Sequence, residues 1–247
     1  MTRTSVILWG IAAGLVVLLA PLAAAQDVDP AKAAATAVEQ RDPDKVDPNF
    51  VKGEEWTFDI RFDQPQPLVV TTPGGEKEVY WYFVYTVTNR ADQEKTYIPT
   101  FTLFSDTAAV RRAGVFPTVF EAIKKNRKIR FLENAVTMHG NVLPGDDNAR
   151  TGVAIFAPLD RSTDRFTIFC EGLSGQYVER CPKCASPQTE RSKADPHLKC
   201  LACGSTQVDD KVIRLRKTLA ITYKLPGDKW WLNQDQPIFV SKKWTWR

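Results

Sequence analysis

Hydrophobic and polar residues alternate along much of the chain from residue 54 to residue 225, with the period of two that is typical of β-strands. In the stretch EWTFDIRFD, the residues Trp56, Phe58, Ile60 and Phe62 fall on one face and polar side chains fall on the other. This pattern predicts one half-buried antiparallel strand. In EVYWYFVYTVTN, residues 78–89, both faces are rich in large hydrophobic residues. We therefore expect a central strand covered on both sides, and an outer face that binds a ligand is the alternative.

The rest of the pattern adds further strands and a single helix. Pro99 interrupts the strand signal of TYIPTFTLFSD, and because proline cannot donate to a β-ladder it predicts an edge position or a bulge. Residues 116–133 change to a helical period, with Pro117 near the predicted start of the helix. Strand patterns return at residues 151–159, 165–173 and 217–225. Together these patterns predict a mainly β fold, an antiparallel sandwich with one helix.

The first 25 residues differ from everything that follows. Arg3 precedes a long apolar run that ends in a cluster of alanines, as in a cleaved export signal. We predict a signal peptide at residues 1–25; an uncleaved membrane anchor is the alternative, because the run approaches the length of a membrane-spanning helix. Residues 26–50 are acidic, alanine-rich and poor in large apolar side chains, which predicts a disordered linker. The β-sandwich domain is then expected at residues 51–247.

Composition limits the classes of partner. The chain has 247 residues, of which 43% are hydrophobic and 25% are charged, and this is an ordinary globular composition with enough apolar side chains for a core. The formal net charge is only +4. We therefore expect no nucleic-acid partner, and membrane contact only if the N-terminal segment is not cleaved.

Three stretches, taken in order, resemble a known class of modules. YTVTNRADQEKTYIPTFTLFSD, TGVAIFAPLDRSTDRFTIFCEGLSG and KTLAITYKLPGD follow the turn-and-strand pattern of secreted bacterial immunoglobulin-like modules, including uncharacterised exported proteins of planctomycete type. The resemblance covers residues 54–228. It implies an immunoglobulin-like sandwich in an extracytoplasmic setting, periplasmic or extracellular, and it implies no particular activity.

Four of the five cysteines have the spacing of metal ligands. Cys181 and Cys184 form one Cys-x-x-Cys pair and Cys200 and Cys203 form another, with 15 residues between the pairs. Two intervening residues let the backbone turn tightly enough to aim both sulfurs at one ion, and two such knuckles complete a tetrahedron. The segments CPKC and CLACG resemble zinc-ribbon and rubredoxin-type knuckles. We therefore predict a structural zinc site with four cysteine ligands, and iron can occupy the same four thiolates.

Other fates of these cysteines stay open. Two disulfides are plausible in an exported protein, and CPKC is similar to dithiol redox motifs, although those place the pair at a helix start. Covalent haem is disfavoured because no histidine directly follows either pair. His197 lacks the spacing of a knuckle ligand and is expected to be a solvated loop residue. Cys170 lies in a predicted strand, so we expect a buried free thiol.

The paired cysteines lie in a segment that separates two strands of the predicted sandwich. Residues 178–216 are interpreted as an inserted zinc-ribbon finger whose stems, residues 177–180 and 212–216, pair with each other. Such a small finger has too little core to fold without its metal. Four thiolates around a divalent ion leave a formal charge of about −2. Five nearby basic residues are expected to offset it: Arg180, Lys183, Arg191, Lys193 and Lys199.

The sequence contains no recognisable catalytic motif. Neither His139 nor His197 accompanies a nucleophile motif, and four cysteine ligands leave no open position on the metal for catalysis. The basic run at residues 124–130 is suited to a polyanion, but the end of a helix explains it more simply. Four tryptophans are suited to a glycan or a peptide, but core packing explains them more simply. They are Trp230, Trp231, Trp244 and Trp246.

These observations favour an exported, non-enzymatic binding or structural protein of the cell envelope, with an unknown protein or glycan as its partner. Two other classes stay open. One is a thiol–disulfide redox protein or an enzyme of unrecognised type, and the other is a glycan- or polyanion-binding module.

Overall fold

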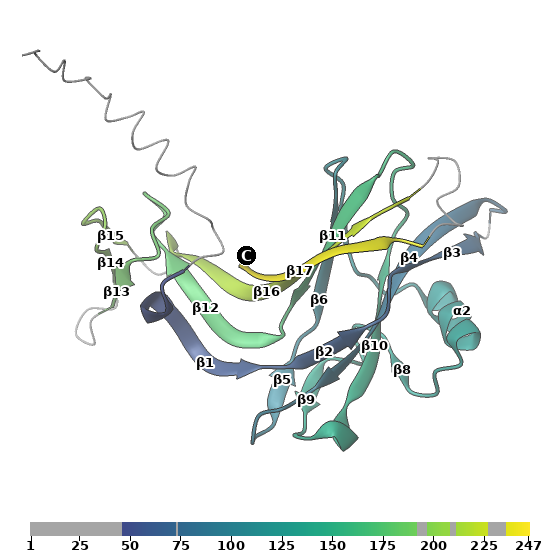
Figure 1. The fold of residues 1–247 in the computed structure, drawn as a ribbon, viewed down its shortest axis with the longest axis horizontal. Helices are drawn as coiled ribbons and strands as arrows, with labels where there is room; N and C mark the ends of the chain where they lie inside the picture. Colours follow the sequence, from purple (N-terminus) through teal and green to yellow (C-terminus); the bar gives the residue numbers. More distant parts are fainter. Residues whose placement is uncertain (1–45, 73, 192–196, 208–210, 227–235) are drawn as a thin grey trace, which may run out of the picture. The chain divides into compact units, whose positions relative to one another are not determined.

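Two β-sheets pack face to face because their strands carry the alternating hydrophobic residues noted above. The computed structural model describes residues 46–72, 74–191, 197–207, 211–226 and 236–247. The first sheet contains, in spatial order, β1 (Val51–Thr57), β12 (Ser174–Arg180), β16 (Ile213–Lys224), β11 (Arg165–Glu171), β6 (Thr100–Ser105) and β7 (Val110–Arg112), with β17 (Ile238–Trp246) also paired to β16. The second contains β2 (Asp59–Phe62), β4 (Lys77–Thr88), β10 (Arg150–Phe156) and β8 (Leu132–Glu133), with β3 (Gln66–Thr71) also paired to β4. Figure 1 shows this arrangement.

Shorter elements complete the described part of the chain. A two-stranded sheet joins β5 (Lys95–Tyr97) to β9 (Gly140–Val142), and a three-stranded sheet contains β13 (Thr189–Glu190), β14 (Leu198–Cys200) and β15 (Thr206–Gln207). Two single turns of 3₁₀ helix are η1 (Pro48–Phe50) and η2 (Asp146–Asn148). The one α-helix of the described residues is α2 (Pro117–Arg127).

The main core lies between the two large sheets and is rich in aromatic side chains. The ring of Tyr85 in β4 lies 4.5 Å from the ring of Phe101 in β6, centroid to centroid. Trp81, also in β4, lies 5.7 Å from Phe166 in β11. These contacts join one sheet to the other, and all four side chains are buried. The burial of such large apolar surfaces is the dominant favourable contribution to the stability of a sandwich.

Helix α2 covers the outer face of the second sheet (Figure 1). Pro117 is its first residue, as the sequence predicts. Val119 and Ile123 are buried and pack in one cluster with Tyr82 of β4 and Ile155 of β10. Strand β4 is therefore covered on both sides, which confirms the prediction made from its two hydrophobic faces.

The strand predicted from Trp56 to Phe62 is instead two strands in different sheets. Strand β1 pairs with β12 in the first sheet, and β2 pairs with β4 in the second. Phe58 lies between them, and its backbone N–H donates to the carbonyl oxygen of Leu173 at 2.8 Å. Alternation alone misses this crossing because the side chains keep one inward face while the backbone changes its pairing partner.

Pro99 occupies neither a sheet edge nor a bulge, so that prediction is wrong. It separates β5 from β6, and β6 is an interior strand between β11 and β7. Because the break removes Pro99 from both ladders, its missing N–H costs no strand pairing. One named strand pair departs from the antiparallel expectation, since β8 runs parallel to β10.

Strand β16 is long enough to pair with β11 and β12 in succession. Gly172 lies between those two strands with φ of +84°, and a Cβ at this position would stand 2.2 Å from the carbonyl oxygen of Ile98. Only glycine fits such a conformation and such a close approach. Beyond this point residues 177–180 of β12 pair with residues 213–216 of β16, which confirms the predicted pairing of the stems. Strands β13, β14 and β15 follow β12 and precede β16 in the chain.

Several predictions concern residues outside the described ranges. These are the signal peptide at residues 1–25, most of the linker at residues 26–50, Lys193, Trp230 and Trp231. Among the residues that the structure describes, no helix is both long enough and apolar enough to cross a membrane.

Candidate metal centre

The two Cys-x-x-Cys segments fold into turns that share one pattern of backbone hydrogen bonds. In each turn the N–H of the residue after the second cysteine donates to the carbonyl of the first cysteine, whose own N–H donates to a serine carbonyl. The donor and acceptor pairs are Ala185 to Cys181 (2.8 Å), Cys181 to Ser186 (3.0 Å), Gly204 to Cys200 (2.9 Å) and Cys200 to Ser205 (2.8 Å). The hexapeptides CPKCAS and CLACGS therefore form two equivalent knuckles.

Each knuckle has a left-handed residue directly after its second cysteine. Gly204 has φ of +70°, as expected for a glycine that permits the turn. Ala185 adopts almost the same conformation, with φ of +57°, although its Cβ makes this region unfavourable. The cysteine spacing alone does not reveal this position, but an alignment of the two hexapeptides places Ala185 opposite Gly204.

The four sulfur atoms come together in one cluster. The Sγ atoms of Cys181 and Cys203 are 3.8 Å apart, and those of Cys184 and Cys200 are 3.6 Å apart. All four ligand atoms lie within 4.8 Å of one another. A tetrahedral site with metal–sulfur bonds of about 2.3 Å has sulfur–sulfur edges of about 3.8 Å, whereas a disulfide bond measures about 2.05 Å. The cluster thus has the dimensions of a tetrathiolate site, and all five cysteines are free.

The four cysteines differ in their access to solvent. Cys181 and Cys200 are buried, whereas Cys184 and Cys203 are exposed. Cys200 is the last residue of β14, and it pairs with Thr189 of β13. The three-stranded sheet therefore fixes the position of the first cysteine of the second knuckle. Each knuckle consequently has one buried cysteine and one that is more accessible to solvent.

The surroundings of the sulfurs affect their protonation in different ways. Ser205 Oγ lies 3.0 Å from Cys203 Sγ and 3.4 Å from Cys181 Sγ. Its hydroxyl, together with its N–H, lowers the pKa of Cys203. A hydrogen bond from the Ser186 backbone favours the thiolate of Cys184, but burial and the neighbouring sulfurs outweigh it and raise the pKa of that thiol. Four adjacent thiols cannot all ionise unless a cation is present to balance them.

A buried carboxylate joins the finger to the first sheet. Glu179, in the β12 stem, has a side chain that is only 1% exposed. It accepts from Lys52 Nζ of β1 at 2.7 Å, from the Arg214 guanidinium of β16 at 2.9 Å and from the Arg191 guanidinium, next to β13, at 3.0 and 3.2 Å. Burial raises the pKa of Glu179, but these three cationic donors outweigh it and lower the pKa to about 2.

This carboxylate is a residue that the sequence analysis missed. Arg191 was expected to offset the charge of the sulfurs, yet it binds Glu179. The available signal was the stem pairing itself, because pairing residues 177–180 with residues 213–216 places Glu179 directly opposite Arg214. The backbone carbonyl of Glu179 also accepts from the Thr189 hydroxyl at 3.4 Å, which adds a contact to β13.

The remaining candidate residues lie apart from the four-cysteine group. His197 is exposed and is not one of the grouped ligands. Cys170 is 0% exposed within the sandwich core, and burial raises the pKa of its thiol, so the predicted buried free thiol is confirmed. Trp244 packs against the main core with Lys217 Nζ over its ring, and Arg127 in the basic run pairs with Asp63.

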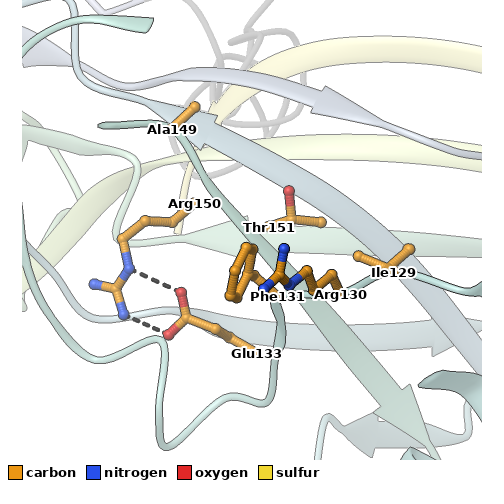
Figure 2. A pocket seen from close by; sticks show the side chains of 7 residues that line it. All are labelled: Ile129, Arg130, Phe131, Glu133, Ala149, Arg150 and Thr151. Carbon is orange, nitrogen blue, oxygen red and sulfur yellow. Dashed lines mark hydrogen bonds and ion pairs between the residues drawn. The ribbon is translucent and has the colours of Figure 1, made fainter. Parts of the chain in front are cut away.

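A pocket of about 300 Å³ lies next to β8 and β10, and Figure 2 shows the side chains that line it. Its polar groups are already paired: the Arg150 guanidinium donates to both carboxylate oxygens of Glu133, at 3.0 and 2.6 Å. The Thr151 hydroxyl lies 3.0 Å from that of Thr86. The Arg130 guanidinium stacks over the exposed ring of Phe131. None of the seven lining residues is an evident nucleophile, and the polar groups named above already have partners within the protein. The four cysteines are therefore the stronger candidate site.

Comparison of the chain with protein-family models, with curated proteins and with solved structures finds no match. The class of the protein therefore rests on its own geometry. It is a mainly β protein with antiparallel sheets and one described α-helix, and an immunoglobulin-like arrangement is compatible with this fold. It carries a cluster of four cysteines that can hold a metal ion such as zinc.

Proposed function

We propose that this chain is an exported β-sandwich protein of the cell envelope whose finger, residues 178–216, is held together by a structural zinc ion. The observation that carries the proposal is the convergence of four sulfurs from two equivalent knuckles to within 4.8 Å. Zinc favours tetrahedral thiolate sites of this kind, and ferrous or ferric iron is the competing metal. The ligands are Cys181, Cys184, Cys200 and Cys203.

The finger depends on this metal because it has little else to stabilise it. Its three strands contain only two or three residues each, and among the described residues between its stems Leu198 is the one large aliphatic side chain that is fully buried. Metal binding therefore supplies most of the free energy that folds it. Without the ion, four ionisable sulfurs would lie next to one another without a balancing charge.

The sulfur-only ligand set supports a structural role over catalysis. Four protein ligands complete a tetrahedral site, so water or substrate has no coordination position. A dithiol redox centre usually places its Cys-x-x-Cys pair at the start of a helix. Here both pairs lie in turns, and a left-handed residue follows each of them. These features favour a binding or structural protein with a protein or glycan partner.

Export is supported by the apolar N-terminal pattern of residues 1–25. The expected mature chain begins at Gln26. The intact mass of protein recovered from its own compartment tests this directly, and a chain that retains residues 1–25 contradicts cleavage. Cross-linking in the native envelope followed by identification of the attached molecule distinguishes a protein partner from a glycan.

Metal analysis together with thiol counting tests the site. Protein purified without added zinc is expected to contain about one metal ion per chain, as four thiolates form one site. Those four thiols should resist alkylation until a chelator is added. Cys200→Ser should lose the metal and unfold the finger while the sandwich still unfolds cooperatively. The matched control Cys170→Ala should keep its metal. A metal-free native chain with four oxidised cysteines would contradict the proposal.

A further inference from the structure

The arrangement of buried and exposed sulfurs points to a second closed state of the finger. We propose that peroxide converts the zinc-loaded finger into a metal-free finger closed by two disulfides across the knuckles, Cys181–Cys203 and Cys184–Cys200. This inference rests on the proposed zinc site. It adds a site of oxidative modification and a specific connectivity.

Each exposed sulfur has a buried sulfur of the opposite knuckle as its neighbour. Exposed Cys203 lies 3.8 Å from buried Cys181, and exposed Cys184 lies 3.6 Å from buried Cys200. To form disulfide bonds of about 2.05 Å, each pair has to approach by less than about 2 Å. We assign this movement to side-chain rotation about the Cα–Cβ bonds, with both knuckles kept folded. We expect an oxidant to react first with the more accessible cysteine of each pair, Cys203 or Cys184.

The chemistry balances with peroxide as the only oxidant. An exposed thiolate attacks one peroxide oxygen, the O–O bond breaks, and a sulfenic acid and one water form after protonation. The buried thiolate of the opposite knuckle then attacks the sulfenic sulfur, the S–O bond breaks, and a second water leaves after protonation. Two such sequences consume two peroxide molecules and four protons, and they yield two disulfides, four waters and free Zn²⁺.

This connectivity keeps the finger closed. The Cys184–Cys200 bond lies inside the loop of the Cys181–Cys203 bond in the sequence, so the two bonds join the knuckles as parallel rungs. Disulfides within each knuckle, Cys181–Cys184 and Cys200–Cys203, would instead leave the knuckles unconnected once the metal has gone. Cys170 takes no part because it is 0% exposed in the sandwich core. The expected thiol count therefore falls from five to one.

Zinc release and peptide mapping test the inference on the full-length protein. Peroxide added to the zinc-loaded chain should release one zinc ion for every two peroxide molecules, as measured with a chromogenic chelator. Trypsin cleaves after Arg180, Lys183, Arg191, Lys199 and Lys211. It therefore places Cys181, Cys184 and the pair Cys200 and Cys203 on three separate peptides. Bonds across the knuckles leave these three peptides linked together, and fragmentation of the linked species assigns the two bonds.

A variant provides the control for pairing. In Cys203→Ser the bond between Cys184 and Cys200 should still form, and Cys181 should remain a free thiol. This measurement does not require the variant to hold zinc.

The outcomes separate the two proposals. A chain that contains no metal before oxidation contradicts the proposed function and, with it, the exchange of metal for disulfides. A zinc-loaded chain that forms bonds within its knuckles, or that keeps its zinc at several equivalents of peroxide, contradicts only the present inference. Alkylation of Cys170 before the finger cysteines react would also contradict it.

Discussion

Replacing Glu179 by glutamine should weaken the connection between the finger and the first sheet. The side chain of Glu179 is 1% exposed, and it accepts hydrogen bonds from Lys52, Arg191 and Arg214. Glutamine has nearly the same volume, so the substitution removes the negative charge without opening a cavity. Three cationic groups then face one neutral amide, and one of its ends can only donate. Both effects oppose the native arrangement.

The size of the effect follows from the pKa. Burial raises the pKa of Glu179, but the three donors outweigh it and bring the pKa down from the usual 4.5 to about 2. This lowering of the pKa corresponds to about 3 kcal/mol of stabilisation, which agrees with the cost of breaking a buried ion pair. Because the folded-state pKa lies below the unfolded-state pKa, this stabilisation is present above about pH 4.5 and is lost as the pH falls through about 2. Between pH 5 and pH 8 it should be constant.

Native-state hydrogen exchange measures this stability where it acts. In the zinc-loaded protein, the amides of residues 177–180 and 213–216 should open more easily in Glu179→Gln by about 3 kcal/mol, or roughly 150-fold in exchange rate. The matched control is Glu190→Gln, which neutralises an exposed carboxylate in β13 and should change the same amides by less than about 0.5 kcal/mol. Equal effects of the two substitutions, or a Glu179→Gln effect that disappears between pH 8 and pH 5, would refute the reasoning.

Three further predictions concern single positions. Ala185→Gly should relieve the left-handed alanine and stabilise the zinc-loaded finger by about 1 kcal/mol, and Gly204→Ala should destabilise it by a similar amount; competition with a chelator measures both as roughly fivefold changes in zinc affinity. Cys170→Ala should lower the free energy of unfolding by about 1–2 kcal/mol, because it leaves a small cavity, while the metal content stays unchanged; loss of metal would show that Cys170 matters for the finger. Gly172→Ala should cost more than about 3 kcal/mol in denaturant unfolding because its Cβ would collide with the Ile98 carbonyl oxygen, and a neutral result would show that the joint between β11 and β12 adapts.

The sequence predicts those features of the fold that depend on local pattern. Alternation predicts the inward faces of the strands, the two hydrophobic faces of β4 indicate a covering layer, and the change of period at Pro117 identifies the helix. It cannot show which strand pairs with which, because pairing depends on contacts that are remote in the chain. The crossing at Phe58 and the break at Pro99 leave the alternation intact on both sides, so the pattern merges two strands at each of them.

The candidate site likewise has one part that the sequence predicts and another part that it does not. The spacing of the cysteines is a local property, and it correctly identifies the four residues that converge in one cluster. The partners of Glu179 come from β1, β16 and the start of the finger, which are far apart in the sequence. Glu179 therefore has no recognisable signal in the sequence by itself. Its role becomes visible only when β12 is paired with β16, which places it opposite Arg214.

The charges of the finger and its stem support one further step. Lys52, Arg191 and Arg214 surround Glu179, so this cluster alone has an excess of two positive charges. Glu179 lies two residues before Cys181 in the chain, and Arg191 directly follows β13, whose Thr189 pairs with Cys200. A divalent metal with four thiolates carries a formal charge of about −2, which is opposite in sign to that excess and equal to it in size. The ion cluster around Glu179 therefore carries the charge that would offset a tetrathiolate site, as the proposed zinc requires.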